Sequence, residues 1–141
     1  MSCALPNVFG ILETAIYVRD LQTAAEFYHR VFQFDTLLNS DRLIALDVAG
    51  RSVLLLFKEG ATREPFATPG GIIPGHDGSG QTHFAFSIAA DDVPGWRDQL
   101  RSADIAIESE VNWPGGAQSL YFRDPDQHLV ELITTGFWRI Y

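Results

Sequence analysis

Three ionisable side chains in this sequence lie in otherwise apolar stretches, and their types are those that bind divalent metal ions. Glu13 lies within the apolar stretch 11–18, His83 precedes Phe-Ala-Phe at 84–86, and Glu131 lies within Leu-Val-Glu-Leu-Ile at 129–133. Burying an unpaired carboxylate is costly, so Glu131 faces either solvent or a cavity where a cation or a proton-transfer role accounts for it. Two carboxylates and one imidazole form a candidate site for Mn²⁺, Fe²⁺, Ni²⁺, Co²⁺, Mg²⁺ or Zn²⁺.

Each of these residue types also has an ordinary interpretation. A histidine in a strand is commonly a hydrogen-bonded core or edge residue, and a carboxylate such as Glu13, taken alone, commonly faces solvent. The other histidines are expected outside the site. His29 is expected on a helix surface, His128 in a structural or surface role, and His76 in a loop from which it could approach a site as part of a lid.

The elements that would position these side chains occur twice along the chain. A helix is expected after Asp20, which can cap it, and a second helix from Asp91 or Asp92 to about Ala103. Periodicity and turn residues predict strands at 11–18, 34–38, 43–48, 52–57, 81–89, 105–111, 119–122 and 128–134. The order βαβββ therefore repeats with an offset of about 70 residues.

This repeat relates the candidate residues to one another. Glu13 and His83 hold the same early position in the first strands of their halves. Glu131 lies in the last strand of the second half, and the matching place in the first half is roughly Leu55. The repeat therefore favours one shared site over three independent strand residues.

Two further stretches are candidates for substrate contact. Ser119, Tyr121 and Arg123 alternate with apolar residues and so share one face of their strand. If Glu131 faces the same side, they offer hydroxyl and guanidinium donors to a ligand; otherwise they form a solvated face. Residues 59–80 contain six of the 12 glycines and no periodicity, which predicts a long structureless loop and a candidate lid.

The composition limits the classes of partner. A net charge of −8 and a pI near 4.7 argue against nucleic acid or an anionic membrane, since both require a basic face. The single cysteine, Cys3, allows neither an intrachain disulfide nor a cysteine metal cluster. No secretion signal and no apolar run of about 18 residues is visible, so a cytoplasmic protein of one domain is expected.

Three motifs carry a resemblance to a known superfamily. They are Tyr17-Val-Arg-Asp-Leu21 with Phe27-Tyr28, Thr82-His-Phe-Ala-Phe86, and Tyr121-Phe-Arg-Asp-Pro-Asp126 leading to Glu131. Over about residues 10–135 the chain resembles the vicinal oxygen chelate superfamily, which includes glyoxalase I, bleomycin-resistance proteins, fosfomycin-resistance proteins and extradiol dioxygenases. The resemblance implies a single α+β domain over 1–141. Two βαβββ modules, at about 10–58 and 81–135, would curl into an open cup-shaped mixed sheet around a divalent metal ion.

The resemblance also assigns ligands. His83 and Glu131 match metal ligands of the superfamily, and Glu13 matches a third, where many members have histidine and some glyoxalases have glutamine or glutamate. Leu55 stands near the fourth, carboxylate ligand of glyoxalase I, which counts against glyoxalase I activity. Ala15 and Val111 stand near a threonine and a lysine of the fosfomycin thiol transferases, which counts against that function.

Two functions are therefore expected as alternatives. The first is a metal-dependent lyase, isomerase or dioxygenase-type enzyme, a homodimer, that chelates vicinal oxygens of a small substrate. Glu13 or Glu131 would be its general base, and Ser119, Tyr121 and Arg123 would bind the substrate. The second is a metal-free protein that, like the bleomycin-resistance members, sequesters an aromatic or cationic small molecule. The sequence leaves open whether the site forms within one chain or across a dimer.

Overall fold

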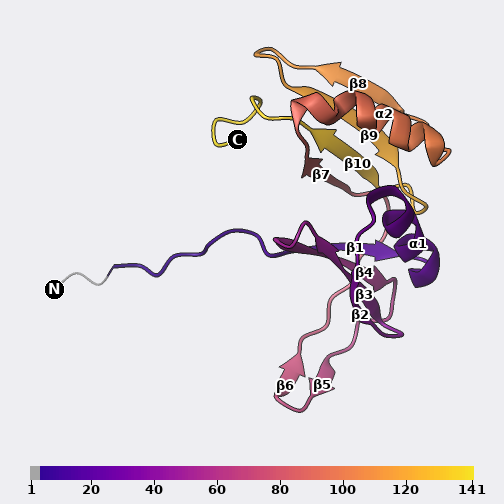
Figure 1. Ribbon diagram of the computed structural model, residues 1–141. Coiled ribbons are helices and arrows are strands. Elements are labelled where there is room, and N and C mark those ends of the chain that lie inside the picture. Colours follow the sequence, from indigo (N-terminus) through magenta and orange to yellow (C-terminus); the bar gives the residue numbers. More distant parts are fainter. Residues whose placement is uncertain (1–3) are drawn as a thin grey trace.

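The two predicted βαβββ units are both present, one after the other along the chain. The computed structural model describes residues 4–141, so Cys3 lies outside the described part. Module 1 consists of β1 (Glu13–Val18), α1 (Leu21–Phe32), β2 (Thr36–Asn39), β3 (Leu43–Val48) and β4 (Ser52–Lys58). Module 2 consists of β7 (His83–Ser87), the 3₁₀ turn η1 (Ala90–Asp92), α2 (Val93–Ser102), β8 (Ser109–Asn112), β9 (Gln118–Arg123) and β10 (Leu129–Ile133). Figure 1 shows each module as a sheet with its own helix.

The two sheets have the same strand order. Module 1 is ordered β1-β4-β3-β2 and module 2 is ordered β7-β10-β9-β8, with the first strand parallel to the last in both. In these registers Ala15 pairs with Leu55, and Ala85 pairs with Glu131. The equivalence of Leu55 and Glu131 that the repeat predicted is therefore confirmed.

Alternation along the strands separates a core face from an open face in module 1. Ile16 and Val18 of β1 are buried in the core with the apolar stripe of α1, whereas Glu13 is exposed on the opposite face. The Asp20 carboxylate accepts a hydrogen bond from the Thr23 amide at 2.8 Å, so the predicted cap of α1 is confirmed. This hydrogen bond lowers the pKa of Asp20.

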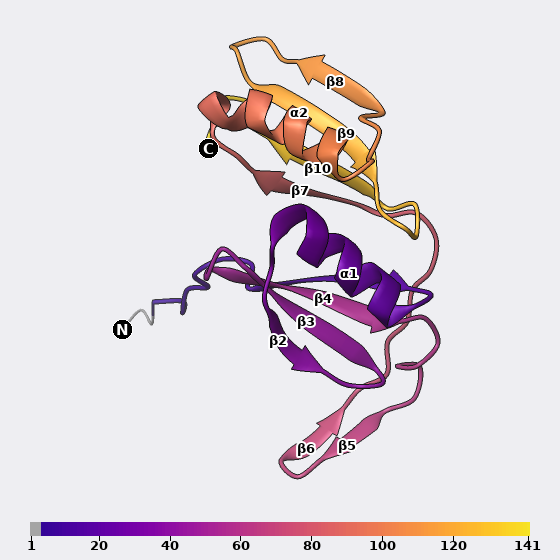
Figure 2. The ribbon, with the colours of Figure 1, turned by 45° about the vertical axis from the view of Figure 1, so that its right-hand side comes forward.

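The modules meet through their helical sides. The Tyr28 hydroxyl of α1 donates to Asp124 at 2.7 Å, and Arg19 pairs with Asp126 at 3.1 Å. His128 is buried, with its Nδ1 accepting from the Thr82 amide at 3.0 Å and its Nε2 donating to the Tyr17 carbonyl at 2.8 Å. Of the two roles expected for His128, the structure shows the structural one. Figure 2 shows α1 on the side of module 1 that faces module 2.

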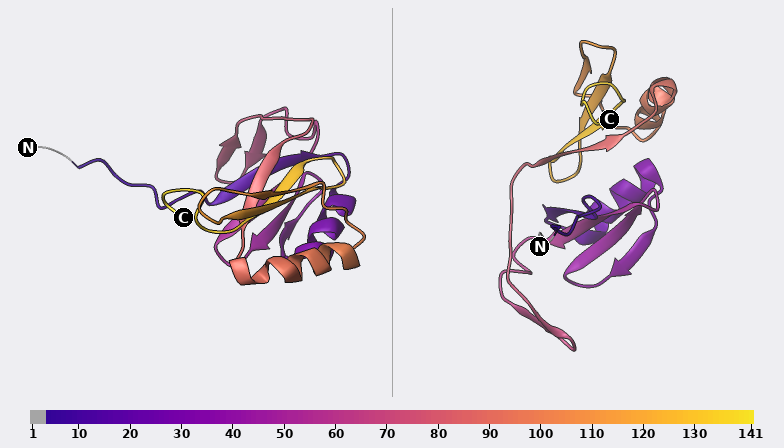
Figure 3. Two further views of the ribbon diagram at one scale, coloured as in Figure 1. Left: turned by 90° about the horizontal axis from the view of Figure 1, so that it is seen from above. Right: turned by 90° about the vertical axis from the view of Figure 1, so that its left-hand side faces the viewer.

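The segment 59–80 is more ordered than the sequence predicted. It contains a small hairpin, β5 (Phe66–Thr68) and β6 (Gly71–Ile73), so the expectation of a structureless loop was wrong. Its base is closed by the Arg63–Asp77 ion pair at 2.6 Å and by the His76 amide, which donates to the Thr62 carbonyl at 2.8 Å. Three-residue strands are too short to show periodicity, which is why the hairpin was missed. Figure 3 shows the hairpin projecting from the body of the molecule.

The described N-terminal residues form an extended arm. Residues 4–12 carry no helix or strand and extend away from module 1 (Figure 1). The arm presents exposed apolar side chains at Leu5, Val8, Phe9, Ile11 and Leu12. Within residues 4–141, no helix has both the length and the apolar character that crossing a membrane requires.

Candidate metal-binding site

Glu131 lies in the middle of β10, the strand between β7 and β9 in the sheet, and only 7% of this residue is exposed. Phe84 and Phe86 of β7 pack toward the helical core, so His83 projects from the other face of the sheet. Tyr121 is paired with Glu131 in the register of β9 and β10. The open face of module 2 therefore collects the candidate residues of both strands around Glu131.

Hydroxyl groups hold one oxygen of the buried carboxylate. Glu131 Oε2 accepts a hydrogen bond from Ser119 Oγ at 2.6 Å and another from the Tyr121 hydroxyl at 3.0 Å. Burial and the neighbouring Glu131 raise the pKa of the Tyr121 phenol, which keeps it protonated as a donor. Glu131 is therefore not a solvent-facing strand residue, and its side-chain partners on the open face are Ser119, Tyr121 and His83.

The other oxygen of Glu131 faces His83. His83 Nδ1 lies 2.9 Å from the Leu129 carbonyl, and because a carbonyl only accepts, Nδ1 carries the proton. When His83 is neutral, the lone pair of Nε2 points at Glu131 Oε1, 3.2 Å away, and when His83 is protonated, Nε2 donates to that oxygen. Two acceptors this close repel each other unless a cation, a proton or a metal ion, lies between them.

This pair of atoms fits a divalent metal ion. Adjacent ligands that each lie about 2.1 Å from one metal ion are themselves about 3 Å apart. The hydrogen bond from Nδ1 to a carbonyl is also the arrangement that fixes a ligating histidine with Nε2 free. His83 and Glu131 therefore have the chemistry and the separation of two metal ligands.

Glu13 is not part of this cluster within one chain. Across residues 4–141 no group of three or more His, Cys, Asp or Glu side chains is close enough to hold a metal ion. Glu13 lies on the open face of module 1, near the half-buried Leu55. The single chain thus brings together His83 and Glu131, and Glu13 belongs to a separate half.

Arg123 lies on the same strand as Ser119 and Tyr121, but its guanidinium is engaged elsewhere. Its Nε donates to Glu108 at 3.0 Å and its Nη1 donates to the Gln127 carbonyl at 3.1 Å. The structure therefore groups Ser119 and Tyr121 with Glu131, while Arg123 braces the turn that precedes β10.

Two contacts near the open faces were not foreseen from the sequence. Trp113 Nε1 donates to Ser119 Oγ at 2.8 Å. In module 1, Tyr17 shares the open face of β1 with Glu13 and hydrogen-bonds through its hydroxyl to His76 Nδ1 at 2.7 Å. Burial raises the pKa of the Tyr17 phenol, and the charge of Asp77 adds to the shift.

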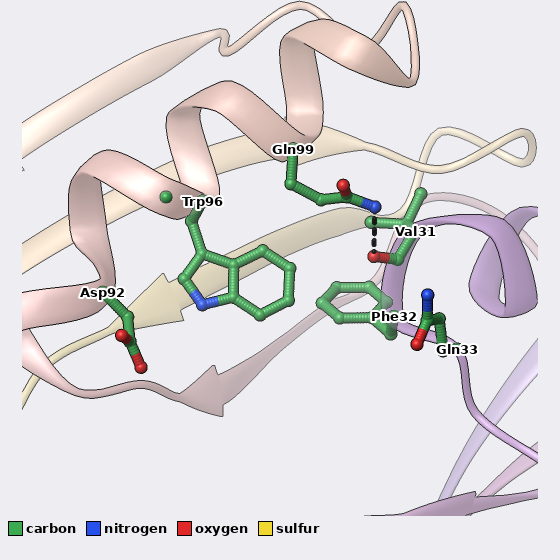
Figure 4. A pocket seen from close by; sticks show the side chains of 7 residues that line it. Val31, Phe32, Gln33, Asp92, Trp96 and Gln99 are labelled. Carbon is green, nitrogen blue, oxygen red and sulfur yellow. Dashed lines mark hydrogen bonds between the residues drawn. The ribbon is translucent and has the colours of Figure 1, made fainter.

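A groove of about 370 Å³ lies elsewhere, between α1 and α2. Figure 4 shows the Trp96 and Phe32 rings side by side in it, with the Gln99 amide donating to the Val31 carbonyl at 3.1 Å. Phe32 also packs against Phe86, on the helical face of β7. The groove is therefore on the opposite side of the sheet from His83 and belongs to the junction between the modules.

Comparison with known proteins agrees with this architecture. The Glyoxalase/Bleomycin resistance protein/Dioxygenase superfamily matches residues 10–132. The chain belongs to this superfamily. The predicted α+β fold of two βαβββ modules is thereby confirmed.

Several members of the superfamily resemble this chain over most of its length. The metallothiol transferase FosB of Staphylococcus epidermidis is 33% identical over 119 residues, covering 83% of this chain and 75% of that protein. FosB of Bacillus licheniformis is 28% identical over 129 residues, covering 91% and 77%. The crystal structure of a lactoylglutathione lyase from Agrobacterium tumefaciens superimposes with a TM-score of 0.86 at 32% identity, covering 95% of this chain and 99% of that one.

Proposed function

We propose that this protein is a metal-dependent enzyme that binds a small substrate through adjacent oxygen atoms. The observation that carries the proposal is the approach of His83 Nε2 and Glu131 Oε1 to 3.2 Å, a separation that suits a proton or a metal ion between the two atoms. His83, Glu131 and Glu13 would hold a divalent ion. When bound, such an ion supplies Lewis acidity, which polarises a carbonyl or hydroxyl oxygen of the substrate.

The residues around the ion would have separate tasks. Ser119 and Tyr121 hold one oxygen of Glu131, so this carboxylate is the fixed ligand. Glu13 is exposed and is the carboxylate with the freedom to take a proton from the substrate as a general base. His83 is kept in one tautomer by the Leu129 carbonyl.

We further propose that Glu13 reaches this site from a second copy of the chain. β1 and β7 are edge strands of their sheets, and Glu13 and His83 stand at the start of these two strands. The hydrogen bonds between the modules of one chain join α1 to α2 and to the turn between β9 and β10, and one reaches the end of β1 at Tyr17. A homodimer that places β1 of one copy beside β7 of the other would complete the ligand set.

The proposed substrate class rests on the names of two relatives. One is called a metallothiol transferase and another a lactoylglutathione lyase, and both names refer to a sulfur compound. We propose a thiol or a thiol conjugate as one reactant. Phosphonate recognition is not supported, because Val111 stands near the lysine of the fosfomycin enzymes and the chain carries a net charge of −8.

The first test measures metal content by elemental analysis after purification without chelators. Wild type should carry about one divalent ion per chain, and His83→Ala should carry none. Binding of an aromatic or cationic ligand that EDTA leaves unchanged, together with failure to take up Mn²⁺, Ni²⁺, Fe²⁺ or Zn²⁺, would instead establish a metal-free binding protein. Consumption of lactoylglutathione and of other thiol conjugates tests the substrate class separately.

The second test asks whether the site is shared. A Glu13→Ala chain and a His83→Ala chain should each bind no metal, yet their heterodimer contains one site with Glu13, His83 and Glu131 all intact. Co-expression of the two variants with different tags, followed by purification of the heterodimer, should recover about one ion per heterodimer. A site confined to one chain predicts no recovery.

A further inference from the structure

The turn between β8 and β9 places one aromatic side chain directly behind the candidate metal ligands. Trp113 is half-buried, and its indole Nε1 lies 2.8 Å from Ser119 Oγ. Its backbone is fixed as well, because the Trp113 amide donates to the Ala117 carbonyl at 2.8 Å. The indole thus reaches a hydroxyl that is only 1% exposed and in direct contact with Glu131.

The chemistry of these groups fixes the direction of both hydrogen bonds. An indole N–H donates and cannot accept, so Ser119 Oγ accepts from Trp113. The Ser119 proton is then directed to Glu131 Oε2, 2.6 Å away. In a buried network each bond polarises the next, so donation from the indole strengthens donation from the hydroxyl.

These hydrogen bonds fix the orientation of the Glu131 carboxylate. Oε2 is occupied by Ser119 and by Tyr121, at 2.6 and 3.0 Å, which turns Oε1 toward His83. A carboxylate held in this way presents one oxygen to a metal ion without having to be reordered on binding.

The C-terminal residues hold the indole from its other side. The Phe137 ring stacks on Trp113 with centroids 4.4 Å apart and planes 22° apart, and Trp138 packs against Phe137 at 5.0 Å. The stacking keeps the indole plane fixed while its N–H points inward. Trp113 is therefore anchored at its backbone, its ring and its nitrogen.

We propose that Trp113 is a positioning residue for the metal site, acting through Ser119 to hold Glu131 in its ligating orientation. The inference rests on the proposed metal-dependent function. Trp113 itself touches neither metal nor substrate, and its N–H would be a determinant of metal affinity.

The test is a double-mutant cycle on metal affinity, measured by titrating the metal-free full-length protein with Co²⁺. Trp113→Phe removes the N–H and keeps a ring to stack on Phe137. It should weaken Co²⁺ binding about tenfold, the usual effect of losing a partner behind a ligand. Ser119→Ala should weaken it by at least as much. In the Ser119→Ala background, Trp113→Phe should change the dissociation constant by less than about twofold, because the relay is already broken.

The controls separate this role from a general loss of packing. Trp138→Phe alters the same aromatic group without touching Ser119, so its Co²⁺ affinity should equal that of wild type. Equal losses from Trp113→Phe in both backgrounds would show a packing effect and overturn the proposal. Wild type that binds no Co²⁺ would overturn the proposed function along with it, whereas unchanged affinity in Trp113→Phe would overturn only the positioning role.

A metal-free measurement tests the relay directly. The Trp113 indole proton, followed by ¹H–¹⁵N NMR, should exchange with solvent more slowly than that of Trp138. Its protection should be lost in Ser119→Ala. Exchange of the Trp113 proton at the same rate in wild type and Ser119→Ala would contradict the hydrogen bond on which the inference depends.

Discussion

At the scale of single residues, the open face of module 2 is organised around the two oxygens of Glu131. One accepts hydrogen bonds from Ser119 and Tyr121, and the other faces His83. Under the proposed function the two oxygens have separate tasks, one in fixing the side chain and one in ligation. A substitution that keeps the shape of the side chain but changes one atom can therefore separate folding from metal binding.

Glu131→Gln is that substitution. The amide oxygen can still accept from Ser119 and Tyr121, and the amide nitrogen can donate to Nε2 of a neutral His83. We expect metal affinity and activity to fall together by more than about 100-fold. The midpoint of thermal unfolding should stay within about 3 °C of wild type. Calorimetric titration with Mn²⁺ and a thermal melt check both, and unchanged metal affinity would contradict the ligand assignment.

At the scale of elements, the segment 59–80 is held at its base. The Arg63 hydrogen bond, together with backbone donors, lowers the pKa of Asp77 to about 2, so the Arg63–Asp77 pair persists well into the acid range. Since the folded-state pKa is lowered, this contribution is present above about pH 4 and is lost as the pH falls through about 2. The hairpin is consequently attached at one end and free at the other.

Gly75→Ala should loosen this base. A Cβ at Gly75 would lie 2.0 Å from the backbone oxygen of Arg63, so the segment must shift. We expect faster hydrogen exchange and faster proteolytic cleavage over residues 60–78, with no effect on the metal binding proposed for His83 and Glu131. Gly70→Ala is the matched control in the same segment, because a Cβ there meets no atom within 4 Å. Equal protection in the two variants would show that the contact with Arg63 does not hold the segment.

The elements were largely predictable from the sequence, and the completed site was not. Periodicity located β1, α1 and β10, and alternation put Ser119, Tyr121 and Arg123 on one face of their strand, because these are local properties of the chain. Whether Glu131 shares that face depends on the register of β9 and β10, which only the structure supplies. The position of Glu13 relative to His83 depends on how two sheets meet, which no local pattern encodes. The contact of Trp113 with Ser119 depends on the conformation of the turn between β8 and β9, which no local pattern encodes either.

At the scale of the whole molecule, the junction between the modules rests on buried polar contacts. Burial raises the pKa of Asp124, although Tyr28 and backbone amides donate to it. A raised folded-state pKa means that Asp124 favours the folded state in acid and that this contribution is lost as the pH rises through the folded-state value. At neutral pH the donors must therefore stabilise an ionised carboxylate that is almost completely buried.

Tyr28→Phe should weaken this junction in a pH-dependent manner. Removing the hydroxyl leaves Asp124 with one donor fewer, at a cost of about 1.5–3 kcal/mol when the carboxylate is charged. The loss should be smaller near pH 4, where Asp124 is more fully protonated. Urea unfolding at pH 7 and at pH 4 measures the difference. A destabilisation that is the same at both pH values would show that the contribution of the hydroxyl does not depend on the charge of Asp124.

The alternation of the strands also bears on how such a protein can diversify. In β10 the open-face Glu131 lies between Val130 and Leu132 of the core, and in β1 Tyr17 lies between Ile16 and Val18, so an open-face residue can be replaced without disturbing the packing that defines the fold. The matching registers of Leu55 and Glu131 show two such exchangeable positions, one apolar and one a carboxylate. A duplicated scaffold of this kind can exchange one chemistry for another by single substitutions, which accounts for a superfamily in which one architecture carries many activities.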